Sequence, residues 1–268
     1  MNRFEPNRLR KTILDMAFAG STVHIGCAFS IVELLSVLYG KYLRYPENNP
    51  NAPMRDYFVL SKGHGVMAQY ACMKELGWLH DDDIQNYFAD GTKLKGLSDS
   101  RVDGLEVTSG SLGHGLSVGV GLALGAKLNQ TDQKIYALVG DGEINEGPIW
   151  EAALFAAHNK LDNLLVIIDE NGFQAMGTTD EIIRLGDIQA KFEAFGFKTA
   201  HVDGHDINKI DQAISSLWSD SSHTPKVLVA RTVKGKGVSF MENNNAWHYT
   251  RLDKDTYMQA VSELGLGK

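Results

Sequence analysis

Short runs of apolar, branched residues alternate along the chain with longer stretches in which apolar positions recur at helical spacing. Continuously apolar runs such as Leu164-Leu165-Val166-Ile167-Ile168 suit strands that are buried on both faces, as parallel strands are. The predicted strands are Tyr57–Leu60, Ile135–Val139, Leu164–Asp169, Phe197–Val202 and Val227–Arg231. The predicted helices cover residues 6–18, 29–44, 64–77, 114–129, 146–159, 186–195, 206–218 and 254–264. This alternation predicts an α/β fold with a parallel sheet between helix layers.

The chain reads as one domain over residues 1–268, because the sequence has no internal repeat, low-complexity segment or flexible linker. Residues 44–55, with Pro46, Pro50 and Pro53, are expected to form a surface loop. In open parallel sheets, ligands bind beyond the carboxyl ends of the strands, so motifs that directly follow a strand are the ones to inspect.

Composition narrows the class of function. The chain is 43% hydrophobic and 22% charged, which is ordinary for a soluble globular protein, and its net charge of -7 without a basic cluster argues against nucleic acid. The polar first twelve residues exclude an ordinary secretory signal, and no run approaches the roughly 18 apolar residues of a membrane span. Cys27 and Cys72 lack metal-ligand spacing in sequence and are expected to be reduced core thiols. A cytoplasmic protein without a membrane partner is expected.

Two predicted strands end in motifs that carry chemistry. The strand Ile135–Val139 leads into Gly-Asp-Gly-Glu-Ile-Asn-Glu-Gly over residues 140–147, and the strand Leu164–Asp169 leads into Glu170-Asn171-Gly172. Asp141 and Asn171 are 30 residues apart, which is one strand–helix–strand excursion, so both should lie at the same edge of the sheet.

These positions predict a site for magnesium diphosphate. Asp141 offers a carboxylate, Asn171 an amide oxygen and the backbone at Phe173 a carbonyl, which are ligands that magnesium prefers. Gly140 and Gly142 would let the chain approach a diphosphate closely, at the N-terminal end of the next helix. A Gly-Asp-Gly turn with an Asx cap is the common alternative, but the spacing to Asn171 disfavours it. The Lys-Gly-Lys-Gly of residues 234–237 lacks the spacing of a nucleotide P-loop, and the glycines between 113 and 125 form no dinucleotide fingerprint.

Gly-Asp-Gly followed about 30 residues later by Asn resembles the pattern of thiamine-diphosphate enzymes. Further segments resemble the N-terminal part of the transketolase family in the same order over residues 8–250. They are Val23-His24-Ile25-Gly26, Ser61-Lys62-Gly63-His64-Gly65, the stretch from Glu106 to Gly115, the glutamates Glu146 and Glu151, and Trp247-His248.

The resemblance implies roles for particular residues. His64 and His248 would contact the diphosphate and substrate oxygens, and His24 and His248 would flank the reacting carbon, as suits groups that titrate near neutrality. Glu146 and Glu151 would join a carboxylate network at a subunit interface, Glu146 being counted as catalytic, although an ordinary solvated helix face remains open for Glu151. Cofactor contacts would also come from Gly110, Ser111, Leu112 and Glu143, and the metal would be Mg²⁺ or Ca²⁺. The remaining histidines His80, His158, His201, His205 and His223 are interpreted as structural or merely exposed.

One position departs from the family pattern. Where transketolases usually read Gly-His-Pro, this chain reads Gly96-Leu97-Ser98. An imidazole that would grip the hydroxylated end of a ketose donor is replaced by an apolar side chain, which penalises an unpaired hydroxyl. Either the loop is realigned or the donor differs, and a donor with a methyl group there, such as pyruvate, is one hypothesis.

The resemblance also implies a second chain. A complete transketolase has two further domains, and the one that binds the aminopyrimidine ring would have to come from a C-terminal transketolase-like subunit, plausibly in an α2β2 heterotetramer. The expected reaction is transfer of a two-carbon unit from a ketose or 2-oxo donor to an aldehyde acceptor. Alternatives are a subunit of a pyruvate-using synthase or of a 2-oxo acid dehydrogenase, and a non-catalytic regulatory subunit that keeps the fold. A nucleotide-binding protein is disfavoured because both phosphate-loop motifs are missing.

Overall fold

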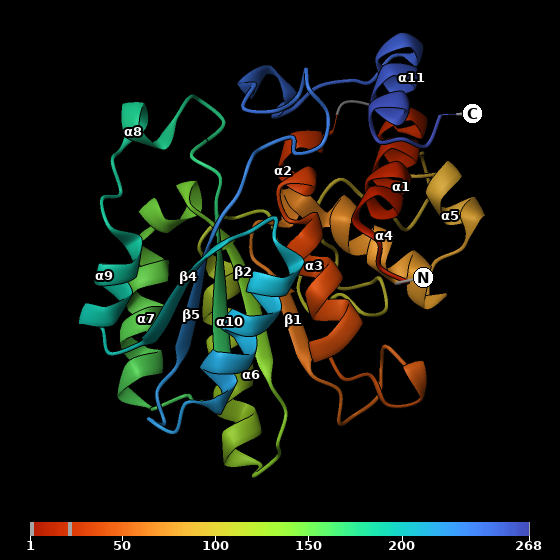
Figure 1. The fold of residues 1–268 in the computed structure, drawn as a ribbon. Coiled ribbons are helices and arrows are strands. Elements are labelled where there is room, and N and C mark those ends of the chain that lie inside the picture. The colour runs from red at the N-terminus through yellow and green to blue at the C-terminus, as the bar shows by residue number, and fades with distance from the viewer. Residues whose placement is uncertain (1–2, 21–22, 268) are drawn as a thin grey trace.

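The computed structural model describes residues 3–20 and 23–267, and the centre of this part is a five-stranded parallel sheet in the order β1-β2-β3-β5-β4 (Figure 1). The strands are β1 (Tyr57–Leu60), β2 (Ile135–Gly140), β3 (Leu164–Glu170), β4 (Lys198–Asp203) and β5 (Lys226–Arg231). The predicted fold class is confirmed, and each predicted strand lies within about one residue of an observed one.

The sheet is buried on both faces, as its apolar runs predict. Along β3, Leu165 and Ile167 belong to one core cluster, while Leu164, Val166 and Ile168 belong to the other, and none of the five is exposed. Alternate side chains point to opposite faces of a strand, so a run with no polar position requires a layer of helices on each side.

The helices divide between the two faces (Figure 1). Helices α6, α7 and α9 contribute to the core on one face, and α1, α3, α4, α10 and α11 contribute to the core on the other. The N-terminal helix α1 and the C-terminal helix α11 lie side by side. The bounds are α1 (Pro6–Ala19), α2 (Ile25–Phe29), α3 (Val32–Val37), α4 (Val66–Leu76), α5 (Asp81–Gln85), α6 (His114–Leu128), α7 (Gly147–His158), α8 (Thr179–Ile182), α9 (Ile188–Ala194), α10 (Ile207–Ser219) and α11 (Lys254–Glu263). Among the described residues, no helix has the length and apolar character that a membrane crossing requires.

The prediction of one helix over 29–44 is wrong. Helix α2 ends at Phe29, α3 begins at Val32, and a π-helical turn (Leu38–Tyr42) follows. The break lies at Ser30, whose Oγ donates to the buried carboxylate of Asp169 at 2.8 Å and also lies 3.1 Å from the backbone oxygen of Cys27. The helix is therefore interrupted where the hydroxyl of Ser30 reaches the end of β3.

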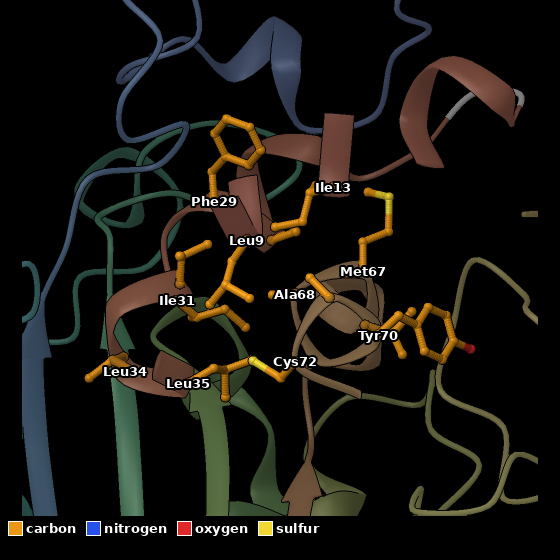
Figure 2. Packing of buried hydrophobic residues seen from close by; sticks show 14 of the residues in the cluster. Leu9, Ile13, Phe29, Ile31, Leu34, Leu35, Met67, Ala68, Tyr70 and Cys72 are labelled. Atoms are coloured by element: carbon orange, nitrogen blue, oxygen red, sulfur yellow. The ribbon is translucent and has the colours of Figure 1, made fainter. Parts of the chain in front are cut away.

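The two cysteines have different surroundings. Cys72 of α4 lies in the apolar core beside Leu35 of α3 (Figure 2) and is fully buried. Cys27 of α2 is also a buried free thiol, but it lines a cleft at the carboxyl ends of the strands. The expectation of two core thiols therefore holds for Cys72, whereas Cys27 is buried next to a functional surface.

Candidate active site

A cleft of about 450 Å³ lies beyond the carboxyl ends of β1, β2 and β3. Of the predicted site residues, all but Ser111 and Glu151 line it: His24, His64, Gly110, Leu112, Gly140, Asp141, Gly142, Glu143, Glu146, Asn171, Phe173 and His248. A larger hollow of about 710 Å³ adjoins it on the side of β4 and β5 and shares Asp141 and Asn171. None of the three predicted histidines lines that hollow, so the smaller cleft is the candidate site.

The register of β2 and β3 places two acidic positions together. Gly140 pairs with Asp169 across the parallel ladder, so Asp141 follows directly beside the end of β3. The Asp141 carboxylate accepts hydrogen bonds from the backbone N–H groups of Gly142 at 2.7 Å and Gly172 at 2.6 Å. Burial, reinforced by the charge of Asp169, raises the pKa of Asp141 to about 7. A carboxylate in this state is stabilised by any cation that binds it.

Asp169 is held by the protein itself. Its carboxylate accepts from Lys62 Nζ, from Ser30 and Thr232, and from Asn171 Nδ2 at 2.7 Å. Burial opposes ionisation, but the ion pair with Lys62 keeps the pKa of Asp169 below its ordinary value. The Asn171 Oδ1 atom accepts from the N–H of Phe173 at 3.0 Å and faces the cleft beside Asp141.

Glu143 connects three segments at the base of the cleft. Its carboxylate accepts from Ser61 after β1, from the N–H of Gly113 at 2.7 Å and from the N–H of Gly140 at 3.0 Å. Gly113 begins α6 with a positive φ of 87°, and a Cβ there would lie 2.7 Å from the Cβ of Glu146. Glu143 therefore fixes the relative positions of β1, β2 and α6, and its predicted contact with a cofactor stays a prediction.

Three histidines from distant segments of the chain, His24, His64 and His248, meet at the cleft and are called the histidine wall below. The ring centroid of His24 lies 5.1 Å from that of His64 and 5.3 Å from that of His248, and those of His64 and His248 are 5.8 Å apart. His24 precedes α2, and His64 lies in the 3₁₀ turn (Gly63–Gly65) after β1. A two-way backbone bridge between Val23 and Thr250 holds the first and third segments together. The structure therefore brings these three histidines together, and their roles stay predictions.

The histidines on this wall are neutral. Burial, together with the nearby ammonium groups of Lys234 and Lys62, lowers the pKa of His24 to about 4. Burial and Lys234 lower the pKa of His248 to about 3, and burial keeps that of His64 well below its ordinary value. A neutral imidazole can accept a proton, donate one from its N–H, or ligate a metal.

The structure adds residues that sequence reasoning passed over. Lys62 and Cys27 line the cleft, and Lys234 Nζ lies 2.7 Å from Nδ1 of His248. Gln174, Ala175 and Met176 line it from the loop after Asn171. Lys62 belongs to the segment Ser61–Gly65 that resembles the family pattern. Its burial could not be predicted from the sequence, because lysine is rarely buried and its partner Asp169 is far away in the chain.

Two predicted residues lie at the margin. Ser111 is exposed and lines a separate hollow with Val107 and Val118, so its cofactor contact stays a prediction. Glu146 lines the cleft but is exposed, and its carboxylate makes no hydrogen bond or ion pair with the described residues. Glu151 is exposed on α7, outside the cleft. The structural interpretation of His205 is supported by a contact of 2.9 Å between its Nδ1 and buried Glu33.

The donor set fits a hard divalent cation and a diphosphate. Each carboxylate oxygen of Asp141 has a single N–H partner and so keeps acceptor capacity, and Asn171 Oδ1 is beside it. Oxygen ligands of this kind, completed by phosphate oxygens and water, are what Mg²⁺ takes. The glycines at 140 and 142 leave backbone rather than side chains at this edge.

Comparison with known families gives one match over nearly the whole chain. The family described as "Transketolase, thiamine diphosphate binding domain" matches residues 5–268.

Comparison with individual proteins points to the same family. The chain is 38% identical over 255 residues to one of the subunits of apulose-4-phosphate transketolase from Phocaeicola vulgatus, covering 95% of this chain and 90% of that protein. It is 37% identical over 261 residues to the SqwG subunit of 6-deoxy-6-sulfo-D-fructose transketolase from a Clostridium species, covering 97% and 94%. A solved transketolase from Campylobacter jejuni superposes with a TM-score of 0.89 at 29% identity. That match covers 100% of this chain but only 43% of the solved one.

Proposed function

Because the chain belongs to the family of transketolase thiamine-diphosphate-binding domains, we propose that it is the diphosphate-binding subunit of a split, transketolase-like transferase. One observation carries the proposal: Asp141 and Asn171 share a cleft with His24, His64 and His248. The reaction is transfer of a two-carbon unit from a ketose or 2-oxo donor to an aldehyde acceptor, within carbohydrate metabolism in the cytoplasm. The relatives from Phocaeicola vulgatus and the Clostridium species are named as subunits of transketolases.

The chain would hold its cofactor through the residues at the strand ends. Asp141, Asn171 and the backbone carbonyl of Phe173 would ligate Mg²⁺ or Ca²⁺, which neutralises the diphosphate. Backbone at Gly110, Leu112, Gly140 and Gly142 would lie against the phosphate oxygens. When bound, thiamine diphosphate supplies a nucleophilic thiazolium carbon and a sink for the negative charge that forms at the donor carbonyl.

The histidine wall supplies proton transfer. His24 and His248 would accept a proton from a donor hydroxyl and return it to the acceptor oxygen. Burial and Lys234 lower their pKa values to about 4 and about 3, so both are weak bases in the chain without cofactor, and the anionic diphosphate would have to raise these pKa values before either ring takes up a proton. Lys234 fixes the ring of His248 through its contact with Nδ1. His64, enclosed by the two other rings, would orient substrate oxygens. Glu146, at the rim, would contribute its unpartnered carboxylate to a site completed by another chain.

A partner is supported by the outer face of α6 and α7. On α6, Val118 is 41% exposed, and on α7, Leu154 and Phe155 are 61% and 47% exposed. Exposed apolar side chains on two helices that pack together are typical of a surface that another chain covers. The occupant is a C-terminal transketolase-like subunit that carries the pyrimidine-binding domain, in an α2β2 heterotetramer. The match covers only 43% of a solved transketolase, and the relative from Phocaeicola vulgatus is itself named as a subunit.

Calorimetric titration tests this proposal directly. Thiamine diphosphate with Mg²⁺ is titrated into the chain alone and into the chain with its co-encoded partner. We expect tight binding only with the partner, abolished by Asp141→Ala and retained in Asp255→Ala, which removes an exposed carboxylate of α11. Phe155→Asp should abolish the gain that the partner brings. Turnover by the complex that survives Asp141→Ala unchanged would instead favour a regulatory subunit that only keeps the fold.

A 2-oxo acid donor is the second candidate, and Leu97 favours it. Leu97 lines the cleft and also a mainly apolar recess next to His24, which is lined by Val23, Phe88 and Tyr249 together with Lys95. An apolar wall there suits a methyl group better than a hydroxyl. A donor screen by kcat/KM, from ketose phosphates to pyruvate, decides between them. Reduction of a lipoyl group in the same screen would identify a 2-oxo acid dehydrogenase subunit.

A further inference from the structure

One side of the histidine wall gathers ligands of a kind that the magnesium site does not use. The Sγ atom of Cys27 and ring nitrogens of His64 and His248 all lie within 4.8 Å of one another. The Sγ of Cys27 is 3.6 Å from Nδ1 of His248. Sulfur and nitrogen ligands at about 2.0–2.3 Å from a tetrahedral Zn²⁺ stand roughly 3.3–3.8 Å apart, so little movement would be needed.

The three groups differ in how readily they would take up a metal. Burial and the neighbouring lysines lower the pKa values of both imidazoles, so little competing proton occupies their nitrogens, while the same lysine charges oppose a metal cation. Neutral imidazole is the form that ligates a metal. Cys27 is 3% exposed yet faces the cleft, and the proposed reaction gives its thiol no task. The ring centroid of His24 lies 5.3 Å from that of His248, but the nitrogens of His24 do not belong to this cluster, so a bound water would complete the coordination.

We propose that Cys27, His64 and His248 form a second metal site, selective for a borderline or soft divalent cation such as Zn²⁺, and that its occupation inhibits the enzyme. Thiolate and imidazole select zinc, whereas the carboxylate and amide oxygens of Asp141 and Asn171 suit Mg²⁺. The cleft would then hold a hard and a soft cation site side by side. A zinc ion on His64 and His248 removes those rings from substrate and proton transfer.

Two features of the site would weaken the binding of Zn²⁺. Lys234 Nζ lies 2.7 Å from the same Nδ1 of His248 that faces Cys27, so the ion must displace that contact and tolerate the charge of Lys62 nearby. Burial raises the pKa of the Cys27 thiol, and its proton must leave to solvent as the sulfur–metal bond forms. No electron is transferred. We therefore expect reversible binding that is weaker than at a structural zinc site.

Cobalt reports the thiolate directly. Co²⁺ is titrated into the full chain without cofactor or partner, and Zn²⁺ is then added as competitor. We expect a sulfur-to-cobalt charge-transfer band with tetrahedral visible bands at one Co²⁺ per chain, both removed by Zn²⁺. Cys27→Ala should lose the charge-transfer band and weaken Zn²⁺ at least about tenfold, or ~1.4 kcal/mol. Cys72→Ala, which removes the thiol in the core (Figure 2), should change neither.

Each result of the cobalt titration either supports or overturns the proposed second metal site. Absence of the charge-transfer band in the unchanged chain, or its persistence in Cys27→Ala, overturns the proposal. If Cys27→Ala does not fold, His248→Gln serves instead: it keeps the thiol, and the loss of tetrahedral cobalt bands supports the site. In the assembled enzyme, Zn²⁺ but not Mg²⁺ should inhibit turnover, with a higher half-inhibiting concentration in Cys27→Ala than in Cys72→Ala. The cobalt experiment needs neither thiamine diphosphate nor a partner, so its failure would leave the proposed function standing.

Discussion

The floor and the wall of the cleft are built on different principles. The floor consists of residues at the ends of the neighbouring strands β2 and β3, namely Asp141, Glu143, Asp169 and Asn171. Its carboxylates accept hydrogen bonds from backbone N–H groups and from Lys62. The wall, formed by His24, His64 and His248, comes from three connecting segments and has few hydrogen bonds to its rings. The floor is fixed by sheet register, whereas the wall is fixed by packing and by the bridge between Val23 and Thr250.

This difference separates two tasks within 450 Å³. Asp141 is an incompletely compensated anion that a cation would relieve. Burial, reinforced by the nearby lysines, lowers the pKa values of His24 and His248 and so disfavours a charge on these rings. Cofactor binding should therefore depend on the floor, and turnover on the wall.

The largest expected effect comes from breaking the floor. In Lys62→Met, the buried Asp169 loses its counter-charge, since the two side chains are only 2% and 0% exposed. We expect the free energy of unfolding to fall by about 3–5 kcal/mol in urea denaturation. Lys127→Met is the matched control, because the Lys127–Asp162 pair is 42% and 33% exposed and should matter by less than about 1 kcal/mol. Equal losses in the two variants would contradict a charge-locked floor.

The next effect isolates the wall. His248→Gln removes a proposed acid–base group and should lower kcat of the assembled enzyme roughly 10²–10⁴-fold. Affinity for thiamine diphosphate with Mg²⁺, measured by calorimetry, should fall far less, because Asp141 and Asn171 remain. His158→Gln, an exposed histidine at the end of α7, should change neither quantity. A parallel loss of binding and turnover would mean that floor and wall do not act separately.

The secondary structure and the floor of the cleft could largely be predicted from the sequence, whereas the histidine wall could be predicted only in part. Buried parallel strands leave an unmistakable apolar run, and residues that follow such strands must meet at one edge, so Asp141 and Asn171 could be paired from spacing alone. The histidines were brought together only by resemblance, because no periodicity links positions 24, 64 and 248. The helix predicted over 29–44 failed because residues 31–39 are apolar on all sides apart from Glu33 and Ser36, which hides the break at Ser30. Helices α5 and α8 are too short for a periodic signal.

A smaller effect tests the apolar side of the wall. Leu97→His would offer a donor hydroxyl a hydrogen-bonding partner worth about 1–1.5 kcal/mol. We expect the ratio of kcat/KM for ketose phosphates over pyruvate to rise about tenfold, with Phe88→Leu as an apolar control in the same recess. A ratio that does not move would exclude Leu97 as a determinant of the donor.

The smallest effect is acid sensitivity of the wall in the chain without cofactor. A histidine whose pKa is lower in the folded than in the unfolded chain stabilises the fold above about pH 6.5. That contribution disappears as the pH falls toward the folded values, about 4 for His24 and about 3 for His248. The double variant His24→Gln/His248→Gln should therefore lose Tm less steeply between pH 6.5 and 4 than the unchanged chain. Parallel slopes would show that the rings are protonated without cost.

Glu143 has a consequence for the dynamics of the whole base of the cleft. One buried carboxylate receives the amide hydrogens of Gly113 and Gly140 and the hydroxyl of Ser61. Releasing any one of these donors leaves a partly unpaired charge in the interior, so the segments gain little by opening alone. Hydrogen exchange at the two glycine amides should accordingly follow a single, large opening event. The base of the cleft would then behave as one cooperative unit, which either keeps its shape entirely or loses it together.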